Sequence, residues 1–258
     1  MTGRSIDQGA SRRRSGLARA VGAAALAAAL AGCASTGQPG AQRSKDDPLE
    51  PMNRVVFEFN EAIDRAVLKP VAQKYTDWLH PGVRGMVSNF FGNLVDVWTA
   101  ANQLLQGKPV LALSDLTRFT VNTTFGFLGV VDLASEIGLQ KHKEDFGQTL
   151  GRWGVGPGPY LVLPFFGMST VRDAIGLVPD YYGNLLTYAD HDRYYWSART
   201  LEVIDLRAGL LPAEKLLEGA TIDKYSAYRN GYLQRRRNQV YDGDPPEDDD
   251  VPKYDDED

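Results

Sequence analysis

Residues 82–107 read GVRGMVSNFFGNLVDVWTAANQLLQG, and Arg84 and Asp96 are the only charged side chains among them. Pro81 precedes the stretch and Pro109 follows it, which is typical of the two ends of one long helix. A helix at a water-exposed surface usually carries several charges on its outer face. Two interpretations follow: a central helix buried on all sides, or a helix that lies against lipid and lines an uncharged polar passage.

Apolar residues at helical spacing continue along most of the chain and predict a mainly α fold. Further helices are expected at residues 51–68, 110–122, 130–137, 169–177, 194–211 and 222–239, with Pro70 ending the first of them. Residues 153–167, WGVGPGPYLVLPFFG, alternate Gly and Pro with large apolar residues. This pattern favours an extended or looped Gly/Pro-rich segment, or a small hairpin, within a compact helical domain.

The N-terminal segment has the composition of a secretory signal. Basic residues precede an apolar stretch at 20–31, which is too short to span a bilayer and lies just before Cys33, the only cysteine in the chain. Residues 30–33, LAGC, resemble the lipobox of bacterial lipoproteins, in which cleavage precedes a cysteine that carries a diacylglycerol. Ala34 follows in place of the aspartate that retains such proteins at the inner membrane, so the resemblance implies an outer-membrane anchor facing the periplasm. The alternative is an ordinary signal peptide with an incidental cysteine.

Charge divides the chain into four expected parts. Residues 1–32 are the signal peptide, 33–47 a flexible polar linker from lipidated Cys33, 48–241 the helical domain, and 242–258 a disordered acidic tail. The tail carries ten acidic side chains against Lys253, whereas the body is neutral overall. A nucleic-acid-binding protein would show a basic stripe, so we expect no nucleic-acid partner.

The sequence contains no pattern typical of catalysis. It has no G-x-S-x-G nucleophile elbow, no metal-ligand spacing among its three histidines, and no cysteine other than the anchor. His142 with Glu144 and Asp145 is a possible acid–base pair, although a charged surface loop is the simpler interpretation. We therefore expect a protein that is not an enzyme and has no cofactor and no metal.

A series of motifs in order along the chain resembles the MlaA (VacJ) lipoproteins. The first is DPLEPMNR at residues 47–54, and DFGQTLG at 145–151 and GVGPGPY at 154–160 are the most specific. Others are NFFGNL at 89–94, Asn102 with LQGK at 105–108, RF at 118–119, VN at 121–122, Gly129, Asp132, LP at 163–164 and RD at 172–173. The resemblance covers residues 47–239.

This resemblance implies a ring-shaped helical protein seated in the inner leaflet of the outer membrane, with an amphipathic channel through the ring. Its implied partners are trimeric porins and a periplasmic lipid carrier, MlaC. The implied function is to take mislocalised phospholipids from the outer leaflet and pass them to that carrier, which maintains lipid asymmetry. Two alternatives remain open: a structural or adaptor lipoprotein that tethers partners at the outer membrane, and a periplasm-facing lipid hydrolase.

Candidate site residues follow from the motifs and from the aromatic content. The lipid attachment site is Cys33. The expected lipid-channel or family-motif residues are Asn53, Arg54, Asn60, Asn89, Phe90, Asn93, Asn102, Gly156, Pro157 and Gly158. The expected membrane belt is Phe91, Trp98, Phe125, Phe127, Phe165 and Phe166, and for each aromatic ring the alternative is core packing.

Overall fold

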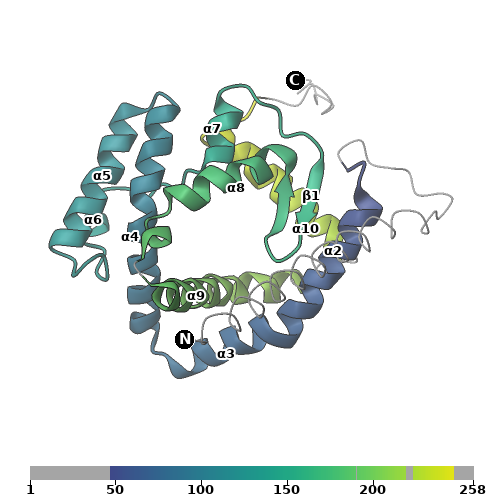
Figure 1. Ribbon diagram of the computed structural model, residues 1–258, viewed down its shortest axis with the longest axis horizontal. Coiled ribbons are helices and arrows are strands. Elements are labelled where there is room, and N and C mark those ends of the chain that lie inside the picture. Colours follow the sequence, from purple (N-terminus) through teal and green to yellow (C-terminus); the bar gives the residue numbers. More distant parts are fainter. Residues whose placement is uncertain (1–46, 190, 219–222, 247–258) are drawn as a thin grey trace, which may run out of the picture.

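The computed structural model describes residues 47–189, 191–218 and 223–246, so Cys33 with its leader, residues 34–46 and acidic residues 247–258 lie outside it. The fold is mainly helical, as the sequence predicts. Figure 1 shows the elements following one another around a ring, with α5 and α6 on its outer side beside α4. The elements are α2 (Glu50–Ile63), η2 (Asp64–Leu68), α3 (Lys69–Trp78), α4 (Pro81–Leu105), α5 (Pro109–Thr124), α6 (Leu133–Glu136), α7 (Phe146–Arg152), β1 (Tyr160–Leu163), β2 (Gly167–Thr170), α8 (Val171–Gly183), η3 (Leu185–Tyr188), α9 (Asp192–Glu218) and α10 (Lys224–Val240).

One arm of the ring is formed by α2, the π-helical turn η2 and α3, which run on without a break in helical backbone. The expected helix end at Pro70 is therefore wrong. Proline has no N–H, and in an α-helix its ring meets the carbonyl four residues earlier. Just before Pro70 the backbone forms a π turn, in which the N–H of Lys69 bonds to the carbonyl five residues back, that of Asp64, and not to the one four residues back. The π turn therefore changes the distance along the helix between the proline ring and the carbonyl that it would otherwise meet.

Helices α4 and α5 form an antiparallel hairpin. His80 caps α4 by accepting the N–H of Gly82, and Gly107 adopts a φ of +77° in the turn before α5. Exposed residues of α4 include Val83, Met86 and Leu104, so this helix is not buried on all sides. The first of the two interpretations of residues 82–107 is therefore wrong.

Residues 153–167 contain the expected small hairpin. Strands β1 and β2 pair antiparallel, with Tyr160 opposite Thr170 and Leu163 opposite Gly167. The helix expected at 169–177 begins two residues later, because the Thr170 side chain caps α8 by accepting the N–H of Asp173.

Helix α7 has no counterpart among the helices expected from the sequence. Gly147 and Gly151 lower its helix propensity, but a Cβ on Gly147 would lie 2.6 Å from Asp173 Oδ1 and one on Gly176 would lie 2.7 Å from the nitrogen of Gly147. These glycines let α7 and α8 approach closely. Helix α9 likewise extends beyond its expected end, through Pro212 to Glu218.

The folded body extends past the expected boundaries at both ends. Asp47, placed at the end of the flexible linker, is fully buried and accepts hydrogen bonds from Asn53 and the Tyr225 hydroxyl. Asp242, placed in the disordered tail, forms an ion pair with Lys108 at 2.5 Å. Both corrections have the same cause, since each carboxylate finds a partner far away in the sequence.

Candidate functional site: an apolar surface on a polar interior

Burial in this protein is opposite to that of a protein surrounded by water. Within the described chain, buried polar and charged side chains outnumber buried apolar ones, and the largest fully buried side chains include Arg118, Gln103 and Asn53. Large apolar side chains are instead exposed along most helices. Folding in water buries Val, Leu, Ile and Phe, so this distribution is typical of a surface in contact with lipid.

The polar interior is clearest between α4 and α5. Three side chains of α4 lie at i, i+3 and i+7 on one face, and three of α5 have the same spacing. We call these six residues the polar seam; all are nearly or fully buried, and they are Asp96, Thr99, Gln103, Asp115, Arg118 and Asn122.

Arg118 is the best-connected residue of the polar seam. Its Nη2 donates to both carboxylate oxygens of Asp132 at 2.9 Å, and its Nη1 donates to the carbonyl of Leu139. Partial burial raises the pKa of Asp132, but hydrogen bonds from Ser135, Asn122 and Arg118 outweigh it, and the pKa falls to about 2. The pair therefore stays ionised and fixes α5 to the start of α6.

Two further carboxylates of the polar seam have partners from the loop at 139–143. Lys141 Nζ lies 2.5 Å from Asp96 Oδ1, and His142 Nδ1 lies 2.8 Å from Asp115 Oδ1. Burial raises the pKa of both Asp96 and Asp115, and the hydrogen bonds from Lys141 and His142 reduce the shift. The possible acid–base pair of His142 with Glu144 or Asp145 does not form, because His142 contacts Asp115 and the other two carboxylates contact Gln106 and Arg236.

The exposed apolar residues include three that hold an unfavourable backbone. Phe127, Leu128 and Phe165 have φ values of 52°, 59° and 66°, and 80%, 66% and 76% of each residue is exposed. Glycine and asparagine are the usual residues at such φ values, and a large side chain costs about 1–3 kcal/mol there. Phe165 meets the ring of Phe59 edge-on, but most of each of these three residues is exposed, which favours contact with an apolar medium.

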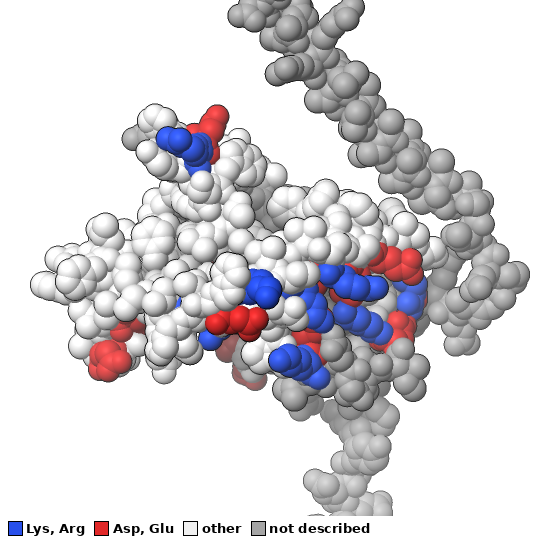
Figure 2. All heavy atoms as spheres, turned by 90° about the horizontal axis from the view of Figure 1, so that it is seen from below, with Lys and Arg blue, Asp and Glu red and all other residues white. Residues whose placement is uncertain are grey.

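Charge is distributed unevenly over the surface. In Figure 2 much of the visible surface carries no charge, and Lys, Arg, Asp and Glu gather in a band along its lower part, apart from a small group at the top. Within the residues that the structure describes, no helix combines the length and apolar character needed to cross a bilayer.

The five expected channel asparagines make structural hydrogen bonds. Asn53 and Asn60 of α2 bond to backbone groups of the β hairpin, and Asn89 donates to the carbonyl of Val130. Asn93 and Asn102 are buried; Asn93 donates to Thr123 Oγ1 at 2.8 Å, and Asn102 accepts from Thr149 Oγ1 at 2.7 Å. Packing between elements thus occupies these amides.

The other expected channel residues lie in different parts of the ring. Arg54 joins α2 to the start of α10, 2.7 Å from Asp223 Oδ2, and the Asp223 hydrogen bond is the main cause of its raised pKa. Phe90 is half-buried with its ring edge against Phe91. Gly156, Pro157 and Gly158 line a pocket together with the C-terminal half of α10.

The expected membrane belt divides into two groups. Phe125, Phe127, Phe165 and Phe166 are 70–80% exposed. Phe91 is a correction, since it is only 7% exposed and therefore belongs to the interior. Trp98 also points inward: its Nε1 donates to Asp180 at 2.7 Å, and its ring fills the space beside Gly183.

Sequence reasoning missed the buried ion pairs. Arg118, Asp132 and Asp173 were recognised only as parts of motifs, Asp145 also as part of a possible acid–base pair, and Arg236 was not singled out. One sequence signal could have indicated these ion pairs. Asp96 is one of only two charged residues in a 26-residue apolar stretch, and a charged residue in such surroundings is typically buried together with a partner of opposite charge.

A helical ring with an apolar surface and a polar interior is typical of a class of membrane-associated proteins. Residues 45–239 match the family model described as MlaA lipoprotein. The chain belongs to the MlaA lipoprotein family.

Characterised relatives and a solved structure agree with this assignment. The intermembrane phospholipid transport system lipoprotein MlaA of Escherichia coli K12 is 37% identical over 212 residues, which cover 80% of this chain and 82% of that protein. The protein of the same name from Haemophilus influenzae is 31% identical over 230 residues, 84% of this chain and 88% of that protein. A structure reported as the "structural basis for maintenance of bacterial outer membrane lipid asymmetry" has a TM-score of 0.68 and 34% identity, covering 76% of this chain and 100% of that chain.

Proposed function

We propose that this protein is an outer-membrane lipoprotein that removes mislocalised phospholipids from the outer leaflet and passes them to a periplasmic carrier. The observation that carries the proposal is the apolar surface around a hydrogen-bonded polar interior. Such a body gains no advantage in water but fits within one leaflet of a bilayer, where apolar side chains meet acyl chains. Diacylation of Cys33 would hold the body at that membrane.

The proposed role is transport without bond cleavage. His142 is paired with Asp115, and the carboxylates nearest to it in sequence, Glu144 and Asp145, contact Gln106 and Arg236. The interior polar groups therefore support packing, and the family relationship supports a transport component.

Trimeric porins and an MlaC-like carrier are the proposed partners. The uneven charge supports two different kinds of contact. The apolar surface suits a porin, which is a neighbour within the membrane, and the charged band suits the carrier, which arrives through water. Photo-crosslinking from exposed apolar positions and from the charged band would test this assignment. Capture of a porin from the charged band only would overturn it.

The Gly/Pro segment is proposed to shape the lipid path. A Cβ on Gly156 would meet nothing within 4 Å, whereas Gly158 has a φ of +66° and faces Val171 at 3.2 Å. Gly156→Ala therefore stiffens the segment without a clash, and reduced lipid transport in this variant is the expected result. Unchanged transport would remove the segment from the path.

The function is tested by measuring outer-leaflet phospholipid in the native host after deletion of the gene. We expect surface phospholipid to rise, wild-type protein to correct it, and Cys33→Ala to fail. No rise on deletion would favour the adaptor alternative. Release of fatty acid by the purified protein, lost in His142→Ala, would favour a hydrolase.

A further inference from the structure

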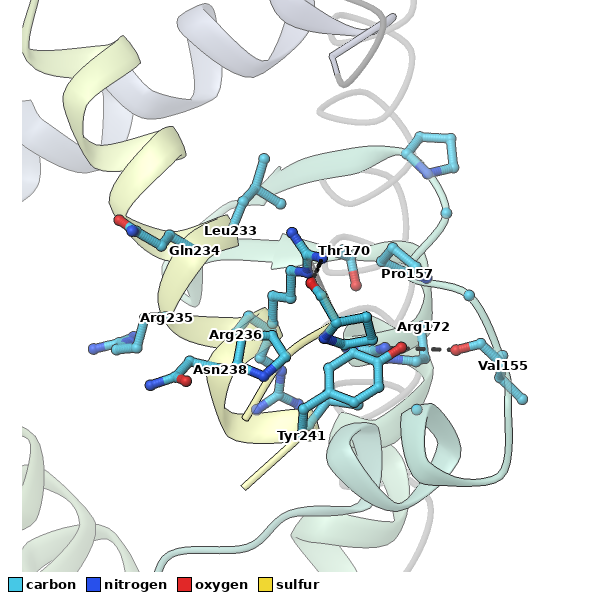
Figure 3. Close-up of a pocket in the computed structure, with 18 of the residues that line it drawn as sticks. Val155, Pro157, Thr170, Arg172, Leu233, Gln234, Arg235, Arg236, Asn238 and Tyr241 are labelled. Atoms are coloured by element: carbon cyan, nitrogen blue, oxygen red, sulfur yellow. Dashed lines mark hydrogen bonds between the residues drawn. The ribbon is translucent and has the colours of Figure 1, made fainter. Parts of the chain in front are cut away.

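Two pockets of the described chain differ in the partners of their arginines. In the larger pocket, beside the Gly/Pro segment, Figure 3 shows Arg172 and Arg236 near Thr170. Asp173 pairs with both arginines, and Asp145 also pairs with Arg236. These two guanidinium groups therefore serve the packing of α7, α8 and α10. The smaller pocket contains an arginine without such a partner.

The smaller pocket, of about 780 Å³, lies between α3, the start of α4 and the C-terminal half of α9. Arg84 of α4 lines it and forms no ion pair with any residue that the structure describes. Arg84 Nε is shielded from solvent and has no hydrogen-bond partner in the same part of the chain. Asp205 of α9 instead accepts hydrogen bonds from Tyr75 and from Ser88, one turn after Arg84. A ligand that brings an anionic acceptor would therefore satisfy a guanidinium that the fold leaves without one.

The same pocket contains a carboxylate without a partner. Asp77 near the end of α3 is exposed, and its carboxylate has neither a hydrogen bond nor an ion pair among the described residues. The other lining carboxylate, Glu214, lies 3.1 Å from Lys69 Nζ and 2.5 Å from Arg207 Nη2. Asp77 and Arg84 are thus two opposite charges in one pocket, and neither is used by the fold.

A ligand that carries both charges fits these two side chains. A free anion or an acidic peptide would be repelled by Asp77, and a basic peptide would be repelled by Arg84. The headgroup of phosphatidylethanolamine has a phosphate, whose oxygens match a guanidinium fork, and an ammonium, whose three N–H groups suit a carboxylate. Lys215, also exposed at this pocket, adds a second cation for the phosphate.

Apolar side chains accompany the two charges. Three apolar residues of α9 line the pocket: Ala208, Leu211 and Pro212. Trp78 and Val83, each next in sequence to one of the two charged residues, are 79% and 42% exposed. A small zwitterion such as a free amino acid has no use for these side chains, whereas the glycerol and acyl chains of a lipid can contact them.

We propose that this pocket binds the headgroup of the transported phospholipid and favours phosphatidylethanolamine, with the phosphate at Arg84 and the ammonium at Asp77. The proposal rests on the phospholipid-transport function and names the headgroup class of its substrate. It places headgroup recognition at the corner of α3 and α4, away from the polar seam.

The test measures lipid binding to the purified full-length lipoprotein in a non-ionic detergent by calorimetry. The probes are the dihexanoyl forms of phosphatidylethanolamine, phosphatidylcholine and phosphatidylglycerol, together with inorganic phosphate. Phosphatidylcholine keeps the positive charge but has no N–H, and phosphatidylglycerol has no amine. We expect phosphatidylethanolamine to bind about threefold more tightly than the other two lipids, and at least about tenfold more tightly than inorganic phosphate.

Two variants separate the phosphate contact from the amine contact. Arg84→Gln should weaken the binding of all three lipids by about tenfold. Asp77→Asn should weaken phosphatidylethanolamine by about threefold and leave phosphatidylglycerol unchanged, so the headgroup preference disappears. Both side chains lack partners in the fold, so thermal unfolding of the two variants should match that of wild type. Arg65→Gln and Glu58→Gln change exposed residues outside the pocket and are the matched controls, which should bind as wild type.

Any of four results would overturn the proposal. Wild-type lipid affinity in Arg84→Gln would show that Arg84 does not hold the phosphate, and an unchanged preference in Asp77→Asn would show that Asp77 does not hold the amine. Inorganic phosphate bound as tightly as the lipids would leave a free-anion site only. An Arg84→Gln protein that loses lipid binding but restores low surface phospholipid in cells would assign the pocket to a resident lipid of the bilayer. Deletion of the gene tests the transport function separately, because lipid binding to the purified protein does not depend on it.

Discussion

Asn53 and Asn60, two helical turns apart on α2, hold the β hairpin with the same pair of hydrogen bonds. Asn53 accepts the N–H of Val162 at 2.9 Å and donates to the carbonyl of Tyr160 at 2.9 Å. Asn60 accepts the N–H of Phe165 at 2.9 Å and donates to the carbonyl of Leu163 at 3.0 Å. The two amides thus pair with one edge of β1, as a neighbouring strand would.

Replacing these amides should have unequal effects. Asn53 is fully buried and also donates to Asp47, so Asn53→Ala leaves several buried polar groups unpaired and should lower the free energy of unfolding by about 3 kcal/mol. Asn60→Ala acts where water can reach the freed groups and should cost about 1 kcal/mol. Chemical unfolding in detergent measures both. Equal losses would contradict the importance of burial at Asn53.

Gly183 should not tolerate any side chain. A Cβ there would lie 2.1 Å from the ring of Trp98, which is held in place by Asp180. Gly183→Ala should therefore destabilise the protein by about 2 kcal/mol or more, through displacement of α8 from α4. Gly209→Ala is the control, because nothing lies within 4 Å and alanine should stabilise α9 by about 0.5–1 kcal/mol. A Gly183→Ala variant as stable as wild type would refute the close contact.

Phe165 should lower the stability of the protein and strengthen its binding to membranes. Phe165→Gly removes the cost of a φ of 66° and should stabilise the protein in detergent by about 1 kcal/mol. Loss of the exposed ring should nevertheless weaken vesicle binding of the Cys33→Ala form by about tenfold. Phe166→Gly removes an equally exposed ring without relieving a positive φ, so it should weaken binding and lower stability. Flotation and thermal unfolding separate the two effects, and a parallel decrease in both quantities for Phe165→Gly would contradict the role of strain.

Acid should weaken the contact between α7 and α10. Burial alone would raise the pKa of Asp145, but Arg236 outweighs it, and the pKa lies below the ordinary value of about 3.9. An acid with a lowered folded-state pKa stabilises the fold fully above its unfolded value, and this stabilisation is lost as the pH falls through the folded pKa. Unfolding free energy should therefore fall below about pH 4.

Asp145→Asn should remove part of this acid dependence and cost about 3 kcal/mol at neutral pH, since Arg236 loses a buried partner. Glu58→Gln, at an exposed position on α2, is the control. Burial raises the pKa of Asp96 and Asp115, so these two groups act in the opposite direction and above pH 4, where stability decreases as the pH rises through their folded values. An acid transition unchanged in Asp145→Asn would exclude this carboxylate as its source.

Local patterns predicted the helices at 81–105 and 109–124 and the hairpin in 153–167, because proline, glycine and apolar spacing act over a few residues. The same reasoning failed at Pro70 and at α7. The π turn before Pro70 and the close approach of Gly147 to α8 depend on packing between separate elements, and propensity alone argues against both structures.

The site was harder to predict than the fold. Uncharged amides near Phe and Leu were expected to face a lipid path, but Asn93 and Asn102 are buried against other elements. The partner of Asn53 is more than 100 residues away in the chain, so no local pattern could reveal it. Phe127 and Phe165 were expected in the membrane belt from their aromatic character, and both are exposed.

The inverted burial also changes which substitutions the protein can accept. Inside most proteins a residue is chosen for its shape, and outside for its contact with water. Here many interior positions, such as Asn53 and Asn102, supply a particular donor or acceptor, so an exchange of Asn for Leu there removes a required bond. The outer positions need only remain apolar, and many side chains of different shape satisfy that requirement. Neutral drift in this molecule should therefore accumulate among its apolar residues.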